Sequence, residues 1–405
     1  MLVDTAIVGH LGRSQLAALG LAATVLSVFA MFNFLQYGTT AQVARAAGAG
    51  EAGAAARLGA QSLWLSLGIG LVLAVLVAAL AGWAVALLGG EGRSADYAVT
   101  YLRIVAIGVP SAFVALGGQG FLRGVSDLRT PLLVVLAGNV VNVVLELVFV
   151  YGFDWGIRGS AWGTALAQTG MGIGILWAVL RRIGSVNAGL RSALALRLLS
   201  VGRFIFLRTL ALISSFVLTG AVVAHIGEAE LAAHQIAFQL FIFLALVLDA
   251  IAIAGQIIVG RELGAGRAGD AYAASARMIR LAVAVGAIFA IVLLVLRDAI
   301  PRGFSDDPDV LAQCALLWPL FAAMQPLAGA VFALDGILIG ASDGPYLAAS
   351  MAVAFGACVL TLLAAYEGGW GIRGAWAAVL VLMTVRLATL GIRFRRRRWL
   401  VTGWG

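Results

Sequence analysis

The chain repeats itself at an offset of about 215 residues, and the repeated segments are too apolar for a water-soluble fold. Residues 6–18 read AIVGHLGRSQLAA and residues 221–233 read AVVAHIGEAELAA, with seven of thirteen positions identical. Three further pairs keep nearly the same offset: GAGEAG with GAGRAG, GFLRGVSD with GILIGASD, and WGIRG at 155–159 with WGIRG at 370–374. The pattern indicates a duplicated bundle. Repeated halves in a membrane are typical of transporters whose binding site lies between them.

Composition places this bundle in a lipid bilayer. Of the 405 residues, 62% are hydrophobic and 11% are charged, whereas about a quarter of the residues in a soluble domain are charged. A spanning helix needs about 20 apolar residues. The sequence predicts a partial helix ending near Leu11 and eleven full ones. We expect these at residues 16–40, 58–88, 98–122, 131–151, 159–180, 199–226, 231–259, 275–300, 310–339, 345–366 and 374–392.

The predicted fold is therefore an all-α polytopic membrane protein with twelve transmembrane helices, six in each half. An even number means that both halves enter the membrane from the same side, as parallel repeats about an axis along the membrane normal. We predict an N-lobe at residues 1–182, a cytoplasmic linker at 183–198, a C-lobe at 199–394 and a basic cytoplasmic tail at 395–405. By comparison with its repeat mate, the first helix lacks its beginning, so we expect either a start further upstream or a nonfunctional chain.

Arginine sets the expected orientation, because all 27 basic residues are Arg. Most of them lie in loops on one side, including Arg181, Arg182 and the run Arg395–Arg398. Basic loops mark the cytoplasmic face. We therefore expect both termini in the cytosol.

The charge distribution excludes nucleic-acid binding. The formal net charge is +8, but the Arg residues lie mostly in the loops between apolar spans and form no basic groove. GAGEAG and GAGRAG fit a dinucleotide fingerprint but follow membrane helices instead of strands. GASDG at 340–344 fits the pattern of the turn that carries the nucleophile of a serine hydrolase, but no catalytic Asp and His follow it in the sequence. A membrane enzyme would need a His or Cys constellation, and we expect buried free thiols at Cys314 and Cys358. We therefore predict no enzyme, catalytic residue, metal or cofactor.

Ionisable residues inside the spans are the strongest functional signals, because a charge in hydrocarbon is costly. They are Asp4, Glu146, Asp249 and Asp335. Asn139, Asn142 and Glu146 follow the spacing i, i+3, i+7, which predicts one polar face on the fifth helix. Burial favours the neutral form of a carboxyl, so Glu146 can exchange a proton or attract a cation. The alternative is a structural hydrogen bond between helices, and a structural role is at least as strongly indicated for Asp249 and Asp335.

Several motifs together resemble the MATE family of multidrug and toxin exporters. They are VDTAIVGHLG at 3–12, NVVLE at 142–146, LAAHQIAFQ at 231–239 and LGAGRAGD at 263–270. FLRTL at 206–210, VLDAIAIAGQ at 247–256 and LDGILIGASD at 334–343 resemble its DNA-damage-inducible (DinF) branch. The similarity extends over nearly the whole chain.

The resemblance implies two six-helix lobes around a cleft that export organic cations or amphipathic compounds in exchange for H⁺ or Na⁺. It implies a monomer in a bacterial plasma (inner) membrane. By position, Asp4 matches the acid of the first-helix motif, and Asn142 and Glu146 match the Asn and Asp of the fifth-helix motif. Thr164 matches a sixth-helix Thr, and Tyr101 a fourth-helix Tyr. The implied C-lobe acids are Asp249 and Asp335.

Two positions depart from the family pattern. The fifth-helix Asp is Glu146 here, and Gln256 stands where the branch usually has Glu. The longer side chain keeps a titratable group but changes the geometry available to an ion. One alternative function is a lipid-linked precursor flippase of the same superfamily, which would be expected to show a cationic cavity. No cluster of Arg within the spans is evident from the sequence.

Overall fold

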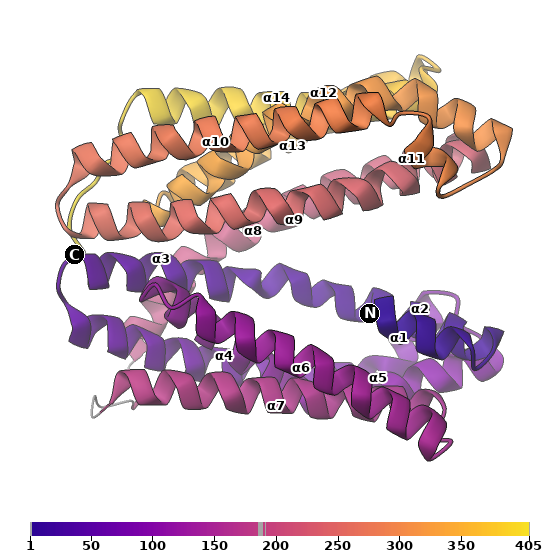
Figure 1. Cartoon of the computed structure of the whole chain (residues 1–405), viewed down its shortest axis with the longest axis horizontal. Helices are drawn as coiled ribbons and strands as arrows, with labels where there is room; N and C mark the ends of the chain where they lie inside the picture. Colours follow the sequence, from indigo (N-terminus) through magenta and orange to yellow (C-terminus); the bar gives the residue numbers. More distant parts are fainter. Residues whose placement is uncertain (1, 185–188, 191, 405) are drawn as a thin grey trace. The chain divides into compact units, whose positions relative to one another are not determined.

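The computed structural model describes residues 2–184, 189–190 and 192–404, and the described chain is helical with no strand (Figure 1). Among these residues, eleven helices are long and apolar enough to cross a membrane. This confirms the predicted all-α membrane fold. The chain divides into two compact lobes: a first lobe of Met1–Val43 and Glu51–Ser200, and a second lobe of Ala44–Gly50 and Val201–Gly405.

The first-lobe helices follow the predicted order, with two irregular turns. The elements are α1 (Leu2–Gly9), α2 (Arg13–Ser27), the 3₁₀ turn η1 (Val28–Asn33), α3 (Phe34–Gly48), α4 (Ala52–Leu87), α5 (Gly92–Gly124), α6 (Arg129–Leu147), the π turn η2 (Val148–Gly152) and α7 (Ile157–Ile183). Helix α5 packs against α4 and α7, and α6 packs against α7. The helix predicted at 16–40 is thus α2 and α3 joined through η1.

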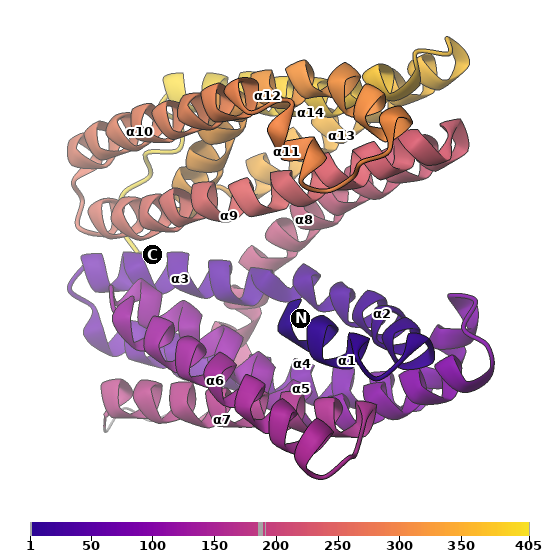
Figure 2. The ribbon, with the colours of Figure 1, turned by 45° about the vertical axis from the view of Figure 1, so that its right-hand side comes forward.

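The second lobe repeats this plan. Its elements are α8 (Ser192–Ile226), α9 (Glu228–Gly264), α10 (Ala268–Val295), α11 (Ala299–Arg302), α12 (Pro308–Gly340), α13 (Gly344–Glu367) and α14 (Gly371–Arg395). Helix α12 packs against α9 and α10 and also contacts α14 (Figure 2). Helix α8 begins at Ser192, so the end of the predicted linker is helical. The remaining boundaries of the predicted lobes, linker and tail stay predictions.

The duplicated motif GFLRGVSD/GILIGASD forms the same turn in each lobe. Ser126 has φ 66° and Ser342 has φ 60°, and in both turns the following Asp amide donates to a carbonyl five residues earlier. Each Asp then pairs with an Arg at the end of the lobe's last helix: Asp127 with Arg182 at 2.7 Å, and Asp343 with Arg393 at 2.7 Å. The repeated turn therefore fixes one end of each lobe.

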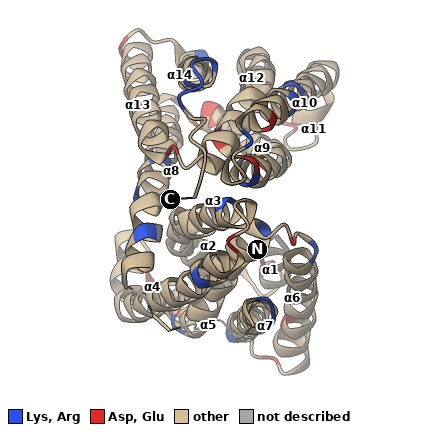
Figure 3. Ribbon diagram, turned by 90° about the vertical axis from the view of Figure 1, so that its left-hand side faces the viewer, with Lys and Arg blue, Asp and Glu red and all other residues tan. Residues whose placement is uncertain are grey.

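Asp127 lies in the loop before α6. Burial acts to raise the pKa of its carboxyl, but the hydrogen bonds from Thr130 and the charge of Arg182 outweigh it and hold this pKa below the ordinary value. The acid therefore stays ionised at neutral pH, as the ion pair requires. Charged groups occupy only a small part of the ribbon (Figure 3).

Glycines let the helices approach closely. The sequence predicts this from the small-xxx-small spacing of three pairs: Gly120 with Gly124, Gly336 with Gly340, and Gly170 with Gly174. A Cβ at Gly120 would lie 2.7 Å from the carbonyl oxygen of Gln36, and one at Gly336 would lie 2.1 Å from that of Ala252. A Cβ at Gly124 would lie 2.6 Å from the Cβ of Val43, and one at Gly340 would lie 2.5 Å from the carbonyl oxygen of Gln256. The prediction is wrong at Gly170, where no atom lies within 4 Å of the added carbon.

The C-terminal segment is folded onto the second lobe. The Arg45 guanidinium, in the part of α3 that belongs to this lobe, donates to the carbonyls of Ala341, Val401 and Gly403. Trp399 is buried and stacks on Phe394 with 5.5 Å between ring centroids. The segment predicted as a basic tail is thus anchored by an aromatic ring and by its own backbone carbonyls. Cys314 and Cys358 are buried free thiols, as expected.

Candidate functional site

Glu146 is the centre of a polar network inside the first lobe. Its side chain is fully buried near the end of α6. One carboxylate oxygen, Oε1, accepts hydrogen bonds from Asn142 Nδ2 at 3.2 Å, Ser160 Oγ at 3.2 Å and Thr164 Oγ1 at 3.3 Å. The other oxygen, Oε2, is buried and has no hydrogen-bond partner among the described residues. This leaves one carboxylate oxygen available to a proton or a cation.

Two glycines on α7 allow this network to form. A Cβ at Gly163 would lie 2.9 Å from Glu146 Cγ, and a Cβ at Gly159 would lie 2.7 Å from the carbonyl carbon of Phe149. Because these positions carry no side chain, α7 can lie against α6 and η2. The hydroxyls of Ser160 and Thr164, one helical turn apart on α7, therefore reach the carboxylate.

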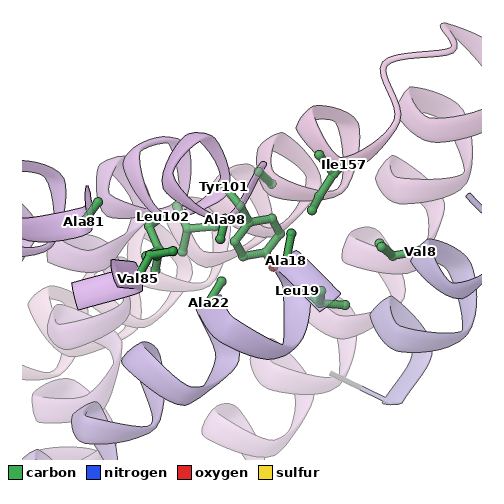
Figure 4. Close-up of a cluster of buried hydrophobic side chains, with 12 residues drawn as sticks. Val8, Ala18, Leu19, Ala22, Ala81, Val85, Ala98, Tyr101, Leu102 and Ile157 are labelled. Atoms are coloured by element: carbon green, nitrogen blue, oxygen red, sulfur yellow. The ribbon is translucent and has the colours of Figure 1, made fainter. Parts of the chain in front are cut away.

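Tyr101 and Asp4, two of the predicted site residues, lie beside this network. Tyr101 is buried on α5, and its hydroxyl lies 3.5 Å from Thr164 Oγ1. Its ring lies in a cluster with Ala18, Leu19 and Ala98 (Figure 4). Asp4 is 5% exposed on α1, and its charge interacts electrostatically with both Glu146 and Tyr101. Two carboxyls thus share one buried region.

The π turn η2 directly follows the segment that carries Glu146. The hydroxyl of Tyr151, within η2, donates to the carbonyl of Ile7 at 3.1 Å. This bond ties α1, which carries Asp4, to the end of α6. The positions of the two carboxyls are thereby linked.

Asn139, the first residue of the predicted polar face, does not join this network. Asn139 is exposed, and its amide donates to the carbonyl of Val135 at 2.9 Å. Seven residues along a helix advance by roughly 10 Å, so Asn139 is too far along α6 to reach Glu146. Ser160 is a member of this network that was not predicted, although its i, i+4 spacing to Thr164 places both hydroxyls on one face of α7.

The two predicted acids of the second lobe differ from each other. Asp249 is half-buried on α9. Asp335, buried on α12, forms ion pairs with Arg208 of α8 and Arg386 of α14. This corrects the expectation that no Arg cluster lies within the spans. The sequence did not reveal it because the three residues come from helices far apart along the chain.

The Arg208–Asp335–Arg386 group is internal to the second lobe. Arg386 is 2% exposed and Asp335 is 4% exposed. Buried charges of this kind require a partner, because isolated charges are strongly disfavoured in an apolar interior. The pairing therefore favours a structural role for Asp335. Glu146 has no cation beside it in any ion pair that joins described residues.

Duplicated apolar helices around a buried carboxyl define a polytopic membrane transporter. The sequence matches the MatE family over residues 1–148 and 205–366. The chain belongs to this family, as the motifs indicated, and is a transporter and not an enzyme.

The sequence relatives come from bacteria and plants. The chain is 30% identical over 411 residues to DNA damage-inducible protein F of Escherichia coli, covering 98% of this chain and 87% of that protein. It is also 30% identical over 401 residues to DETOXIFICATION 44 of Arabidopsis thaliana, covering 95% of this chain and 76% of that protein. The match to DETOXIFICATION 42 of the same plant covers 56% of that protein.

Solved structures show the same fold. The Vibrio cholerae MATE transporter VcmN in its bent form superimposes with a TM-score of 0.89 at 21% identity, covering 98% of this chain and 91% of that one. A multidrug resistance MATE transporter in an outward-facing conformation gives a TM-score of 0.87 at 21% identity. It covers 98% of this chain and 92% of that one. At these identities the likeness establishes the fold alone.

Proposed function

We propose that this protein is a secondary antiporter that exports organic cations or amphipathic compounds in exchange for H⁺ or Na⁺ by alternating access. The carrying observation is Glu146, a buried carboxylate with one oxygen saturated by three donors and the other unpartnered in the described structure. The family match and relatives named for multidrug resistance support small-molecule substrates.

The proposed mechanism follows from competition at one site. A carboxyl that is protonated or holds a cation loses the negative charge that attracts an organic cation. Only one of the two ligands is therefore bound well at a time, and their movements become coupled. Asp4 adds a second negative charge when it is ionised, and Tyr101 provides a hydroxyl at the edge of the network. The hydroxyls of Ser160 and Thr164 hold the carboxylate in place.

The proposed location is a bacterial plasma membrane, with both termini cytoplasmic and the chain acting as a monomer. The Arg-rich loops and the bacterial relatives support this assignment. The alternative proposal is a lipid-linked precursor flippase of the same superfamily. That alternative is tested in the same assay.

The test is ethidium efflux from proteoliposomes containing the full chain, with pH and sodium gradients imposed separately. We expect one gradient to drive export by the wild type and Glu146→Gln to abolish gradient-driven export. Glu51→Gln is the matched control, because Glu51 is exposed before α4 and its side chain makes no capping hydrogen bond. Gradient-driven export by Glu146→Gln at the wild-type rate would contradict the coupling role. If the wild type moves a fluorescent lipid and no ethidium, the flippase alternative is correct.

A further inference from the structure

The first lobe contains a cavity whose lining residues do not belong to the Glu146 network. It has a volume of about 780 Å³, within the range of small-molecule sites. Its walls include Tyr97 from α5, the segment Asp154–Arg158 before and at the start of α7, and Trp162 on α7. Gln15 of α2 closes one side, and its side-chain oxygen accepts a hydrogen bond from the Ile157 amide at 2.9 Å. The cavity is thus built from three helices and a fixed turn.

The cavity combines aromatic rings with unpaired charges. Trp155 is 48% exposed and stacks on Phe149 with 5.3 Å between ring centroids, which holds its ring in place. Asp154 and Arg158 are both exposed, and neither forms an ion pair within residues 2–184, 189–190 and 192–404. Aromatic faces bind organic cations, and a nearby carboxylate adds a counter-charge.

The internal repeat provides a comparison for each wall residue. At the offset of 215, Trp155 and Arg158 correspond to Trp370 and Arg373 of the second lobe, so these two belong to the shared framework. Trp162 corresponds to Ala377, whereas Asp154 corresponds to Gly369. Compared with the second lobe, the first lobe therefore has an added carboxylate in the duplicated turn and an added ring at the corresponding position of α7.

The backbone conformation at Asp154 is one that favours glycine, which Gly369 provides at the corresponding position of the second lobe. Gly369 has φ 64° and Asp154 has φ 55°, so both residues occupy the left-handed region. Glycine adopts this conformation freely, whereas other residues do so at a cost, with Asp and Asn among the more tolerant. The first lobe thus has an acid where the same turn in the second lobe has the favoured glycine. A strained residue in a cavity wall suggests a function for its side chain.

We propose that this cavity is a binding site for organic cations, in which the rings of Tyr97, Trp155 and Trp162 contact the ligand body and the Asp154 carboxylate faces its charge. Arg158 opposes the bound charge and keeps the site weak, so that the ligand can leave. The site lies along the elements that carry the coupling network, since Tyr97 and Tyr101 are one turn apart on α5. The inference rests on the proposed export of organic cations and adds a second place where they bind.

The test is ethidium binding to the purified full chain in detergent, followed by fluorescence. Asp154→Asn and Trp162→Ala should each weaken binding roughly fivefold, the size expected for losing one cation-binding group. Arg158→Gln should tighten binding, and Trp162→Phe should retain most of the affinity. Asp306→Asn is the control for removal of an exposed acid. The affinity for Nile red, a neutral dye, should be the same in Asp154→Asn, in Arg158→Gln and in the wild type.

The outcomes separate this inference from the proposed function. If wild-type proteoliposomes export ethidium but Asp154→Asn and Arg158→Gln bind it as the wild type does, the cavity proposal is wrong and the antiport proposal stands. If the wild type fails to export under either gradient but the two charge variants shift binding in opposite directions, the cavity binds cations and the antiport proposal is wrong. Should Trp162→Ala fail to fold, the two exposed charged residues still decide the result.

Discussion

At the residue scale, the network around Glu146 depends on hydroxyls that a sequence pattern indicates only in part. The family resemblance predicts Thr164, whereas the packing of α7 against α6 is what brings Ser160 to the carboxylate. Both hydroxyls donate to the same carboxylate oxygen, so they stabilise its charged form. Removing either one leaves a buried charge with fewer donors.

We expect Thr164→Val to slow gradient-driven export, because it removes a hydroxyl while keeping the side chain's shape. The loss of one hydrogen bond to a charged group is worth about 1.5–3 kcal/mol, so we expect a decrease of about tenfold or more in rate. Thr164→Ser keeps the hydroxyl and should retain most activity. Equal rates for Thr164→Val and the wild type in the efflux assay would contradict the role of this donor.

The buried ion pairs of the second lobe give a prediction about stability. Asp335→Asn removes the acid that pairs with both Arg208 and Arg386. Breaking a buried charge pair typically costs about 3–5 kcal/mol. We expect a large drop in melting temperature, measured by thermal unfolding in detergent. Asp306→Asn should leave the melting temperature unchanged, and an equally small effect of Asp335→Asn would show that the group is not structural.

At the scale of elements, the contact between α6 and α7 positions the site. Gly163 lies against Glu146, whereas Gly170 on the same helix has no atom within 4 Å of an added Cβ. We expect Gly163→Ala to separate the helices, lower stability by about 1–3 kcal/mol and impair export. Gly170→Ala should be neutral or slightly stabilising, because Ala favours a helix over Gly. Thermal unfolding and efflux of both variants check this, and equal behaviour would contradict the packing argument.

The helices were largely predictable from the sequence, but their irregular turns were not. Apolar length revealed eleven spans, and the repeat revealed their grouping. The 3₁₀ turn η1 and the π turn η2 depend on packing that local sequence does not encode. The same limit explains Asn139, since helical spacing gives the face of a residue but not which part of that face meets a neighbour.

At the scale of the whole molecule, the repeat explains both the likeness of the lobes and their difference. Glu146 and Ser160 correspond, at the offset of 215, to Thr361 and Ala375. The second lobe therefore has the duplicated helices without the duplicated carboxyl. The coupling proposed here belongs to one lobe, while the ion pairs at Asp335 stabilise the other.

The proposed orientation makes a prediction about labelling in intact cells. Glu51 and Glu91 are exposed in consecutive loops at opposite ends of α4. Glu91→Cys should react with a membrane-impermeant maleimide from outside, and Glu51→Cys only after permeabilisation. The natural cysteines are buried and should give little background. The reverse labelling pattern would place the termini outside the cell.

The most direct test of the central claim is competition between ions and an organic cation at Glu146. Ethidium affinity of the purified full chain is measured across a range of pH and of sodium concentration, for the wild type and for Glu146→Gln. We predict that acid or sodium weakens ethidium binding to the wild type, and that Glu146→Gln loses this sensitivity, because its amide neither ionises nor attracts a cation. The same ion dependence in both proteins would contradict the assignment of Glu146 as the coupling group.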